Sequence, residues 1–501
     1  MRLTEVMAGT GAQGAAGSDP AVSIVTCDSR AVRPGAVFFA LRGVRADGHA
    51  FAAEAARRGA VAVVAERPVE CSPASLFVSP APRRDLALAA ANLHGRPGER
   101  LRLAAITGTN GKTTTAYLVD ACARAAGLAS ALVGTVAWRH PGGSRAATHT
   151  TPDPEALQAF LADAVAAGAL VGAMEVSSHA LEQERVAGLE FRAAGFTNLT
   201  RDHLDYHLTM DAYFAAKRRL FEEHLAPGGV AVLNVESGPG QVLARRMAEL
   251  GRTAWTYSAH GDASGATLRA RDARLSLDGI AALVDTPAGK LAVRSPLVGA
   301  HNLENLLCAA GLALALGIPL SAVEAGLAAC PGAPGRLERI ARGGVSAFVD
   351  YAHTDDALAR ALDALRAFAP RRLLCVFGCG GDRDPGKRPI MGEVAGGRAD
   401  LVVATSDNPR TEDPLAILGE IVPGIARAAK APISAAQATA GADGFVVVPD
   451  RREAIALALR AARPGDAVLI AGKGHEDYQI VGVEKRPFDD REEARRALGL
   501  A

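Results

Sequence analysis

The chain has 501 residues, of which 49% are hydrophobic and 22% are charged. At roughly 150 residues per domain, this length predicts about three domains, each able to bury its own core. The composition is that of a globular protein and argues against a disordered or fibrous chain. The formal net charge of +1 gives no electrostatic signature of a protein that binds nucleic acid or an anionic membrane.

The cysteines and the N-terminus predict a cytoplasmic protein. Seven cysteines are scattered along the chain, and the closest pair, Cys375 and Cys379, lacks the spacing of a zinc knuckle. We therefore expect reduced thiols. The first residues lack the apolar segment of a signal peptide. Residues 305–323 carry no charge, but glycines and Pro319 interrupt them, which favours a buried core helix over a membrane span.

The first hundred residues contain short strand-like segments. Two of them, 36–40 and 61–64, are apolar and are separated by turns and by a helix around 50–58. Residues 94–98 (His-Gly-Arg-Pro-Gly) have the composition of a linker. We therefore predict an N-terminal domain over 1–98.

A second region opens with a buried strand over 101–107 and then alternates strands with helices. Residues 330–335 (Cys-Pro-Gly-Ala-Pro-Gly) predict a second linker. The expected boundaries are therefore 99–331 for a central domain and 332–501 for a C-terminal domain.

The C-terminal region contains three short apolar runs, each followed directly by a polar, glycine-rich loop. The runs are 373–377, 401–404 and 468–471. Strands that alternate with helices imply a parallel sheet, and such sheets bind ligands beyond the carboxyl ends of their strands. The loops therefore predict a binding site separate from the one near residue 110.

That other site is a predicted phosphate loop between the strand at 101–107 and a helix over 115–126. Its glycines allow backbone N–H groups to face phosphates, and the helix N-terminus favours negative charge. Lys112 would reach the β- and γ-phosphates, and Thr113 would help to hold Mg²⁺. The match is imperfect, because the first glycine of the general pattern falls at Ile106, and a simple glycine turn is the alternative. The predicted loop residues are Gly108, Thr109, Asn110, Gly111, Lys112, Thr113 and Thr114.

We thus predict an α/β protein of three domains, with a central P-loop-type parallel-sheet ATPase domain and a C-terminal Rossmann-like domain. Glu175 ends an apolar run and could hold Mg²⁺ beside the phosphate loop, or could be a solvated strand end. His203 and His207 have a spacing suited to zinc on a helix, but the glutamate of the H-E-x-x-H motif is absent. A Mg²⁺ ligand or a structural role is favoured.

Lys217 stands out by its position on a predicted helix over 210–225. Apolar side chains lie three and four residues to either side of it, so the lysine falls inside the apolar face. Burial lowers the pKa of a lysine, and a neutral amine is chemically usable. The alternative is a lysine whose stem packs while its ammonium reaches solvent.

Six short motifs follow one another along the chain. They are 108–114 (Gly-Thr-Asn-Gly-Lys-Thr-Thr), 174–179 (Met-Glu-Val-Ser-Ser-His), 197–207 (Thr-Asn-Leu-Thr-Arg-Asp-His-Leu-Asp-Tyr-His), 299–302 (Gly-Ala-His-Asn), 334–336 (Pro-Gly-Arg) and 350–353 (Asp-Tyr-Ala-His). Together they resemble the Mur ligase family of ATP-dependent amino-acid ligases, over about Thr26 to Val481. The resemblance implies peptidoglycan precursor synthesis, and with it roles in cell-wall biogenesis, cell shape and cell division.

The resemblance also implies a site. Lys217 would be carbamylated by CO₂ and would hold Mg²⁺ with Thr113, Glu175 and His203. The implied catalytic residues are Lys112, Lys217, Glu175, His203 and Arg336. Asn302 and Asp350 would contact the adenine and ribose of ATP, and Arg336 its phosphates. The implied contacts to UDP-N-acetylmuramoyl-L-Ala-D-Glu are Cys27, Ser29, Val44, Arg45, Ala46, His149, Thr150, Thr151, Ser177, Gln183 and Arg185.

Residues 407–410 (Asp-Asn-Pro-Arg) resemble the motif of family members that add meso-diaminopimelate. The far end of that amino acid carries an ammonium and a carboxylate. A guanidinium can bind the carboxylate through two hydrogen bonds, and Glu476 can take the ammonium. Lysine has no such carboxylate, so a buried Arg410 and Arg383 would be left unpaired. The predicted site is Arg383, Asp407, Asn408, Pro409, Arg410, Gly472 and Glu476.

The implied reaction joins meso-2,6-diaminopimelate to the D-Glu γ-carboxylate through an acyl phosphate. We expect a monomer with small-molecule substrates and no nucleic-acid or membrane partner. The alternatives are a lysine-adding ligase, a relative of folylpolyglutamate synthase, and, from another class, a nucleotide-dependent phosphotransferase or binding module. The Asp-Asn-Pro-Arg loop argues against the first, the N-terminal domain against the second, and the C-terminal loops against the third.

Overall fold

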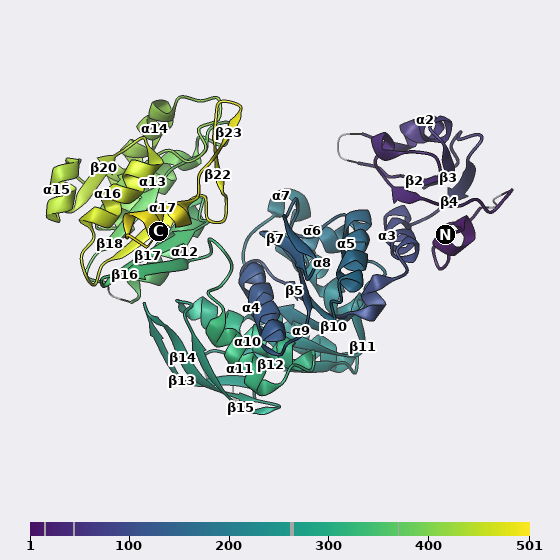
Figure 1. Cartoon of the computed structure of the whole chain (residues 1–501), viewed down its shortest axis with the longest axis horizontal. Helices are drawn as coiled ribbons and strands as arrows, with labels where there is room; N and C mark the ends of the chain where they lie inside the picture. The colour runs from purple at the N-terminus through teal and green to yellow at the C-terminus, as the bar shows by residue number, and fades with distance from the viewer. Residues whose placement is uncertain (15–16, 44–45, 261–264, 369, 501) are drawn as a thin grey trace. The chain divides into compact units, whose positions relative to one another are not determined.

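The computed structural model describes residues 1–14, 17–43, 46–260, 265–368 and 370–500 (Figure 1). The protein is α/β and has three domains, each built on its own sheet of mainly parallel strands. Contacts divide the chain into two compact units. The first is Met1–Arg271 with Val284–Leu291 and Glu304–Leu327, and the second is Asp272–Leu283 with Ala292–Leu303 and Ala328–Ala501. The boundaries at 98/99 and 331/332 stay predictions.

The N-terminal sheet has four parallel strands in the order β1-β2-β3-β4. They are Ile24–Thr26, Ala36–Ala40, Ala60–Ala65 and Ser75–Val78. Every residue of β2 is buried, because α1 (Leu3–Val6) and α3 (Pro82–Leu93) cover one face of the sheet and α2 (Ala52–Arg57) the other. The predicted strand 36–40 and the helix around 50–58 are confirmed.

An eleven-stranded sheet follows, in the order β15-β14-β13-β12-β11-β10-β5-β9-β6-β7-β8. In chain order the strands are β5 (Arg102–Thr107), β6 (Ser130–Val133), β7 (Ala137–His140), β8 (Gly143–Ala146), β9 (Val171–Glu175), β10 (Phe191–Phe196), β11 (Leu225–Asn234), β12 (Thr253–Ser258), β13 (Leu268–Ser276), β14 (Gly279–Thr286) and β15 (Gly289–Ser295). The strands β6, β9, β5, β10, β11 and β12 run parallel, so their carboxyl ends share one edge.

Helices cover both faces of this sheet. One face packs against α5 (Pro154–Ala166), α8 (Met210–Glu223) and α9 (Gly238–Glu249), with the short α6 (Ser178–Glu182) and α7 (Leu204–His207) nearby. The helix α4 (Lys112–Ala125) packs on β6 and β9. Two further helices, α10 (Ala300–Ala315) and α11 (Leu320–Ala329), are divided at Gly317–Pro319, as the sequence predicts. Within the described residues, the chain contains no helix of the length and apolarity that a membrane span needs.

The C-terminal sheet has the order β16-β17-β21-β18-β19-β20, in which only β16 is antiparallel to its neighbour. The strands are Glu338–Arg342, Val345–Asp350, Leu373–Phe377 (β18), Leu401–Ala404 (β19), Gly444–Val447 and Ala467–Ala471 (β21). Alternate strand residues enter two cores. One core includes α12 (Asp355–Arg366), α13 (Lys387–Arg398) and α14 (Pro414–Arg427), and the other includes α15 (Ala435–Ala440), α16 (Arg451–Ala461) and α17 (Asp490–Ala497).

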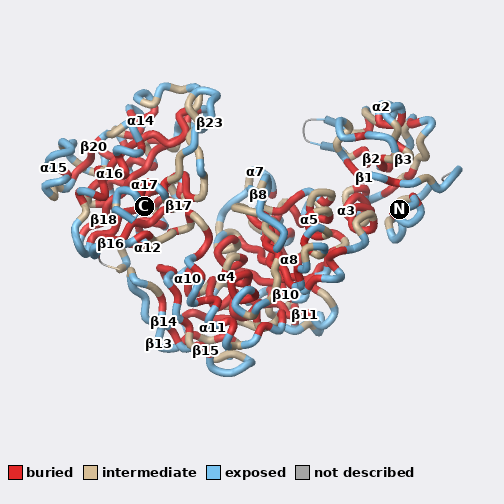
Figure 2. The backbone as a smooth tube through the Cα atoms, viewed as in Figure 1, coloured by how far each residue is buried: buried red, intermediate tan, exposed pale blue. Residues whose placement is uncertain are grey.

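This arrangement confirms the three predicted strand–loop units of the C-terminal region. Figure 2 shows the inner strands of the sheets buried, whereas the edge strand β8, most of β13 and many connecting loops are exposed. A hairpin of β22 (Tyr478–Val481) and β23 (Glu484–Pro487) follows the last loop. Because β21 lies between β17 and β18, and β18 lies next to β19, the loops after these parallel strands meet at one edge of the sheet.

Candidate active site

The predicted phosphate loop joins β5 to α4, as the sequence indicates. Gly111 immediately precedes the helix with a φ of +84°, a backbone conformation that favours glycine, and a Cβ there would also lie 2.2 Å from Asn305 Oδ1. The Lys112 ammonium donates hydrogen bonds to the carbonyls of Gly108 and Thr109, both at 2.9 Å. The helix begins at Lys112 instead of at 115, which brings its N-terminal N–H groups into the loop.

Glu175 lies at the carboxyl end of β9, beside this loop, and its side chain is buried. Its Oε2 accepts hydrogen bonds from Thr113 Oγ1 at 3.0 Å and Thr135 Oγ1 at 3.1 Å, and its Oε1 accepts one from Thr135 N at 2.8 Å. A Cβ on Gly134 would lie 2.2 Å from Oε1, so any other residue there would displace the carboxylate. In the part of the chain that the structure describes, no ion pair neutralises Glu175. Because the Glu175 side chain is buried, the alternative of a solvated strand end is wrong.

Lys217 lies inside the apolar face of α8 and is 1% exposed. Its Nζ donates a hydrogen bond to Gly108 O at 3.0 Å and lies 4.3 Å from the centre of the Tyr213 ring. Burial, reinforced by the positive charge of Lys112, lowers the pKa of Lys217 well below its ordinary value. The alternative in which the ammonium reaches solvent is thus wrong, and the amine is disposed to be neutral.

Three histidines gather next to this lysine. The ring of His179 lies 4.8 Å from that of His203 and 5.3 Å from that of His207, measured between centroids. Burial lowers the pKa of each of them. His203 precedes α7 with a φ of +52°, so the two histidines of the predicted pair do not share a helix. Among the described residues, no three His, Cys, Asp or Glu side chains form a metal-binding group.

The residues of the central domain that are expected to bind the sugar peptide lie around Thr151. Its hydroxyl donates to Glu175 O at 2.9 Å and accepts from Ser177 N at 3.0 Å. Arg185 donates to Thr151 O at 2.9 Å and, through two nitrogens, to Gln183 Oε1. Four predicted residues are thus brought together with the carboxyl end of β9.

Thr150 and Cys27 extend this group. The Thr150 and Thr135 hydroxyl oxygens lie 3.0 Å apart, so the predicted substrate loop is connected to Glu175. The Cys27 backbone donates to Glu155 Oε1 at 3.1 Å. Cys27, Gln183 and Arg185 also line one cavity of ≈ 40 Å³.

The remaining predicted contacts to the sugar peptide are more peripheral. Ser29 begins a short 3₁₀ helix (Ser29–Ala31), and Ala46 and His149 are exposed. The predicted contacts Val44 and Arg45 lie outside the described residues.

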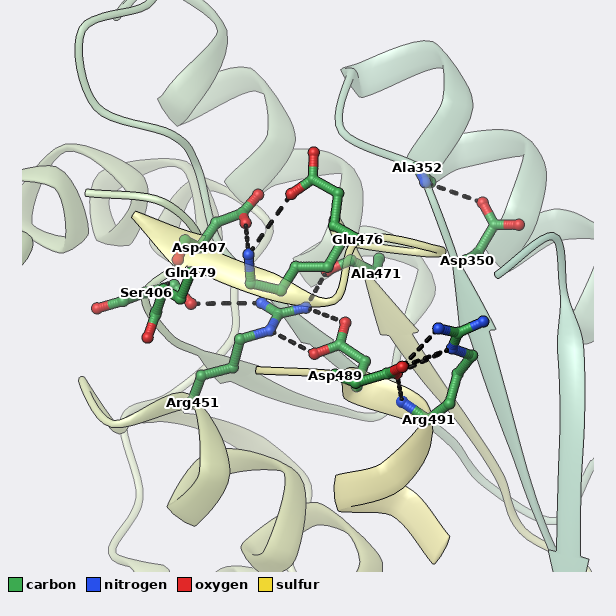
Figure 3. Close-up of polar contacts among 12 residues, drawn as sticks. Asp350, Ala352, Ser406, Asp407, Arg451, Ala471, Glu476, Gln479, Asp489 and Arg491 are labelled. Carbon is green, nitrogen blue, oxygen red and sulfur yellow. Dashed lines mark hydrogen bonds and ion pairs between the residues drawn. The ribbon is translucent and has the colours of Figure 1, made fainter. Parts of the chain in front are cut away.

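The predicted nucleotide contacts Asn302, Arg336 and Asp350 belong to the second unit. Asp350 ends β17 and accepts hydrogen bonds from the backbone of Leu337 at 2.8 Å and Ala352 at 2.9 Å (Figure 3). Burial raises the pKa of Asp350, against the lowering effect of Arg336. Within the described chain, Arg336 Nε is buried and has no hydrogen-bond partner. Asn302 donates to Val298 O at 2.7 Å in the first turn of α10.

The loops after β19 and β21 meet at Asn408. Its Nδ2 donates to Glu476 Oε2 at 3.0 Å, and its Oδ1 accepts from Ile480 N at 2.9 Å. Asp407, Pro409 and Gly472 are buried beside it.

The two arginines of the predicted diaminopimelate site are less enclosed than the sequence suggests. Arg383 is exposed and donates to Asp382 O, and Arg410 is half-buried and donates to Gly381 O at 2.7 Å. The prediction that both are buried is wrong, because the glycine-rich turn at 378–381 places them at the rim of the loops.

Sequence reasoning missed several polar residues that support the site. Thr135 contacts Glu175, and the fully buried Lys473 contacts Asn408. Arg451 is bound to Asp490 at 2.7 and 2.6 Å, and it donates to Ser406 O and Ala471 O at the ends of two site strands (Figure 3).

A fourth such residue, Arg388, donates to Gly380 O at 3.3 Å and to Glu412 at 2.8 Å, which ties two loops together. Of these four residues, only Lys473 has a local sequence signal, its position within Gly-Lys-Gly. The contacts are made to residues up to 65 positions away along the chain, so the local sequence does not reveal them.

Comparison with known proteins adds to this geometry. Three family models match the chain, described as "Mur ligase family, catalytic domain" over residues 21–102, "Mur ligase middle domain" over 106–313 and "Mur ligase, glutamate ligase domain" over 335–474. A protein of Geobacter metallireducens named UDP-N-acetylmuramoyl-L-alanyl-D-glutamate--2,6-diaminopimelate ligase is 47% identical over 94% of this chain and 93% of its own. A protein of Gloeobacter violaceus with the same name is 46% identical over 99% of this chain and 98% of its own.

A solved structure with that name is 36% identical, with a TM-score of 0.71 over 95% of this chain and 94% of its own. Identity at this level over nearly the whole length, together with three matching domain models, shows that the chain belongs to the Mur ligase family.

Proposed function

We propose that the chain is an ATP-dependent ligase that joins meso-2,6-diaminopimelate to the D-Glu γ-carboxylate of UDP-N-acetylmuramoyl-L-Ala-D-Glu. The observation that carries this function is the identity of 47% over 94% of the chain to a relative named for this reaction. The loop cluster at Asn408 and the phosphate loop at Lys112 supply matching chemistry on the described chain. Relatives with this name span the chain almost end to end, so the whole reaction is assigned to it.

The reaction needs an activated carboxylate, because oxide is a poor leaving group. The γ-phosphoryl group of ATP passes to the D-Glu γ-carboxylate, which gives an acyl phosphate and ADP. The amine of diaminopimelate then attacks the carbonyl carbon, phosphate leaves with the electrons of the C–O bond, and the nitrogen loses a proton. Lys112 would leave its two loop carbonyls to neutralise the phosphate charge that develops during transfer. Arg336, whose buried Nε is an unused donor within the described residues, would bind a phosphate oxygen.

The residues around Glu175 fit a Mg²⁺ ion. A buried carboxylate oxygen and the Thr113 hydroxyl lie 3.0 Å apart, and hard oxygen donors of this kind suit that ion. The carboxylate carries a charge that its uncharged donors leave unbalanced. Bound Mg²⁺ would supply charge neutralisation between the phosphates and the attacking carboxylate. Thr113, Glu175, His203 and a carbamylated Lys217 would hold it.

The environment of Lys217 supports its carbamylation. Only the neutral amine attacks CO₂, and burial beside Lys112 favours the neutral form. The product would carry a carboxylate in place of an ammonium, next to the phosphate loop. That change of sign would turn a repelling charge into a ligand for the metal.

The substrates would enter from different domains. Thr150, Thr151, Ser177, Gln183 and Arg185 would orient the peptide end of the sugar nucleotide, with its γ-carboxylate near the end of β9. The C-terminal loops would bind diaminopimelate, with Glu476 and Asp407 on its ammonium and Arg410 and Arg383 on its distal carboxylate.

We also propose domain boundaries at 98/99 and 331/332, between the three sheets.

Phosphate release with ATP, Mg²⁺ and the UDP-sugar dipeptide tests this function, with meso-diaminopimelate and L-lysine as parallel acceptors. We expect release with diaminopimelate and little with lysine. Release with lysine alone would retain the ligase but contradict the proposed amino acid. No release with either acceptor would refute the proposed function.

A further inference from the structure

A fully buried lysine lies at the centre of the C-terminal loops. The Lys473 side chain is 0% exposed, and its ammonium donates to Asn408 Oδ1 at 2.9 Å and to Tyr478 O at 2.6 Å. Its Nζ is 3.4 Å from Asp407 Oδ1 and 3.6 Å from Glu476 Oε2. Figure 3 shows the carboxylates of Asp407 and Glu476 approaching the same point from two loops.

The charges in this cluster do not cancel. Two carboxylates, whose side chains are 10% and 17% exposed, share one ammonium, so one negative charge remains. Asp407 Oδ1 is also buried and accepts no hydrogen bond from the residues described. The Lys473 ammonium faces this oxygen at 3.4 Å without a hydrogen bond, and an excess negative charge that is mostly buried is costly, so the cluster favours the binding of a second cation.

A second nearby cation is already paired with another carboxylate. Arg451 lies beneath the loops, but Asp490 takes two of its nitrogens at 2.7 and 2.6 Å, and both side chains are 0% exposed. That pair is balanced within itself. Among the described residues, Lys473 is therefore the cation in direct ion-pair contact with both Asp407 and Glu476.

We propose that Lys473 is a positioning residue that balances one of the two carboxylates, so that the loops offer a single negative charge to the ammonium of the incoming amino acid. The proposal rests on the proposed function, in which diaminopimelate binds these loops. Lys473 also holds Asn408 Oδ1, and Asn408 in turn donates to Glu476. Without the ammonium, the two carboxylates repel each other, and Asn408 loses one of the contacts that orient it toward Glu476.

The test compares Lys473→Met with the double variant Lys473→Met/Asp407→Asn, which restores the net charge of the cluster. We expect the single variant to raise the KM for diaminopimelate by about tenfold or more, with the KM for ATP unchanged. The double variant should recover part of that loss. Lys485→Met is the matched control, because Lys485 is an exposed lysine that contacts the ring of Tyr478 at 3.6 Å in the adjoining hairpin.

Two results overturn the proposal: a KM for diaminopimelate in Lys473→Met like that of the wild type, or a double variant no better than the single one. If Lys473→Met does not fold, Lys473→Gln, which keeps a donor to Asn408 without the charge, takes its place in both comparisons. The wild type is measured alongside with diaminopimelate. Its failure to use diaminopimelate would refute the proposed function, whereas normal wild-type activity with unaffected variants would refute only the role of Lys473.

Discussion

Thr135 is outside the family motifs, yet its hydroxyl joins the carboxylate of Glu175 to the substrate loop. Thr135→Val keeps the size of the side chain and the backbone bond to Glu175 Oε1 at 2.8 Å, but it removes the hydroxyl bonds to Glu175 Oε2 and Thr150. A hydrogen bond to a charged group contributes about 1.5–3 kcal/mol and one between neutral groups about 0.5–1.5 kcal/mol. Relaxation recovers part of the sum, so we expect a loss of about 2 kcal/mol, or roughly 30-fold in kcat/KM.

The assay is phosphate release as a function of Mg²⁺ concentration, with Thr135→Ser as the matched control because serine keeps the hydroxyl. The valine variant should need more Mg²⁺ for half-maximal rate, since Glu175 loses one of the donors that orient it. The serine variant should stay near the wild type. A valine variant with wild-type kcat/KM and Mg²⁺ dependence would refute the idea that Thr135 positions Glu175.

Arg410→Ala should lower kcat/KM for diaminopimelate, with a loss of about 2 kcal/mol in transition-state stabilisation. This is the lower end of the cost of unpairing a buried charge, because Arg410 is half-buried. An unchanged kcat/KM would remove Arg410 from the site. Arg451→Met should lower the free energy of unfolding by about 3–5 kcal/mol in chemical denaturation, since it leaves Asp490 buried and unpaired. Arg451→Met/Asp490→Leu should recover much of that loss, and an equal loss in the double variant would contradict the ion-pair explanation. Burial and the charge of Arg336 lower the pKa of His475 to about 4. As the pH falls, the unfolded chain therefore binds a proton at this histidine before the folded chain does, so the stability of the fold decreases from about pH 6.5 toward pH 4. His475→Gln should therefore flatten the pH dependence of Tm over that range, and an unchanged slope would count against the shift.

Much of the fold follows from short-range patterns. The strands 36–40, 373–377 and 401–404 match their predicted bounds, because each is an uninterrupted apolar run ended by polar or glycine-rich sequence. Helical periodicity placed Lys217 in the apolar face of its helix but left open whether the ammonium reaches solvent, and the structure shows the side chain to be buried. The start of α4 was predicted three residues late, since Lys112 to Thr114 are polar and carry no periodic signal.

The supporting residues of the site could not be predicted in the same way. Arg451 and Arg388 are buried charges whose partners come from distant loops, so no local pattern marks them. Lys473 has only the Gly-Lys-Gly sequence around it as a local signal, and its partner Asn408 lies 65 residues away. The prediction of a buried Arg383 failed for the related reason that exposure at a loop rim depends on how neighbouring loops pack. Residue type and spacing indicate which groups can act, whereas tertiary contacts decide which of them are enclosed.

Transfer of oxygen from substrate to phosphate tests the central claim most directly. The UDP-sugar dipeptide is labelled with ¹⁸O in the D-Glu γ-carboxylate and incubated with ATP, Mg²⁺ and meso-diaminopimelate. The masses of the released phosphate and of the tripeptide product are then measured by mass spectrometry. The account predicts one ¹⁸O in the released phosphate for each diaminopimelate added to the sugar peptide, because the acyl phosphate breaks at its carbonyl C–O bond. Unlabelled phosphate, or labelled phosphate without the tripeptide product, would contradict it.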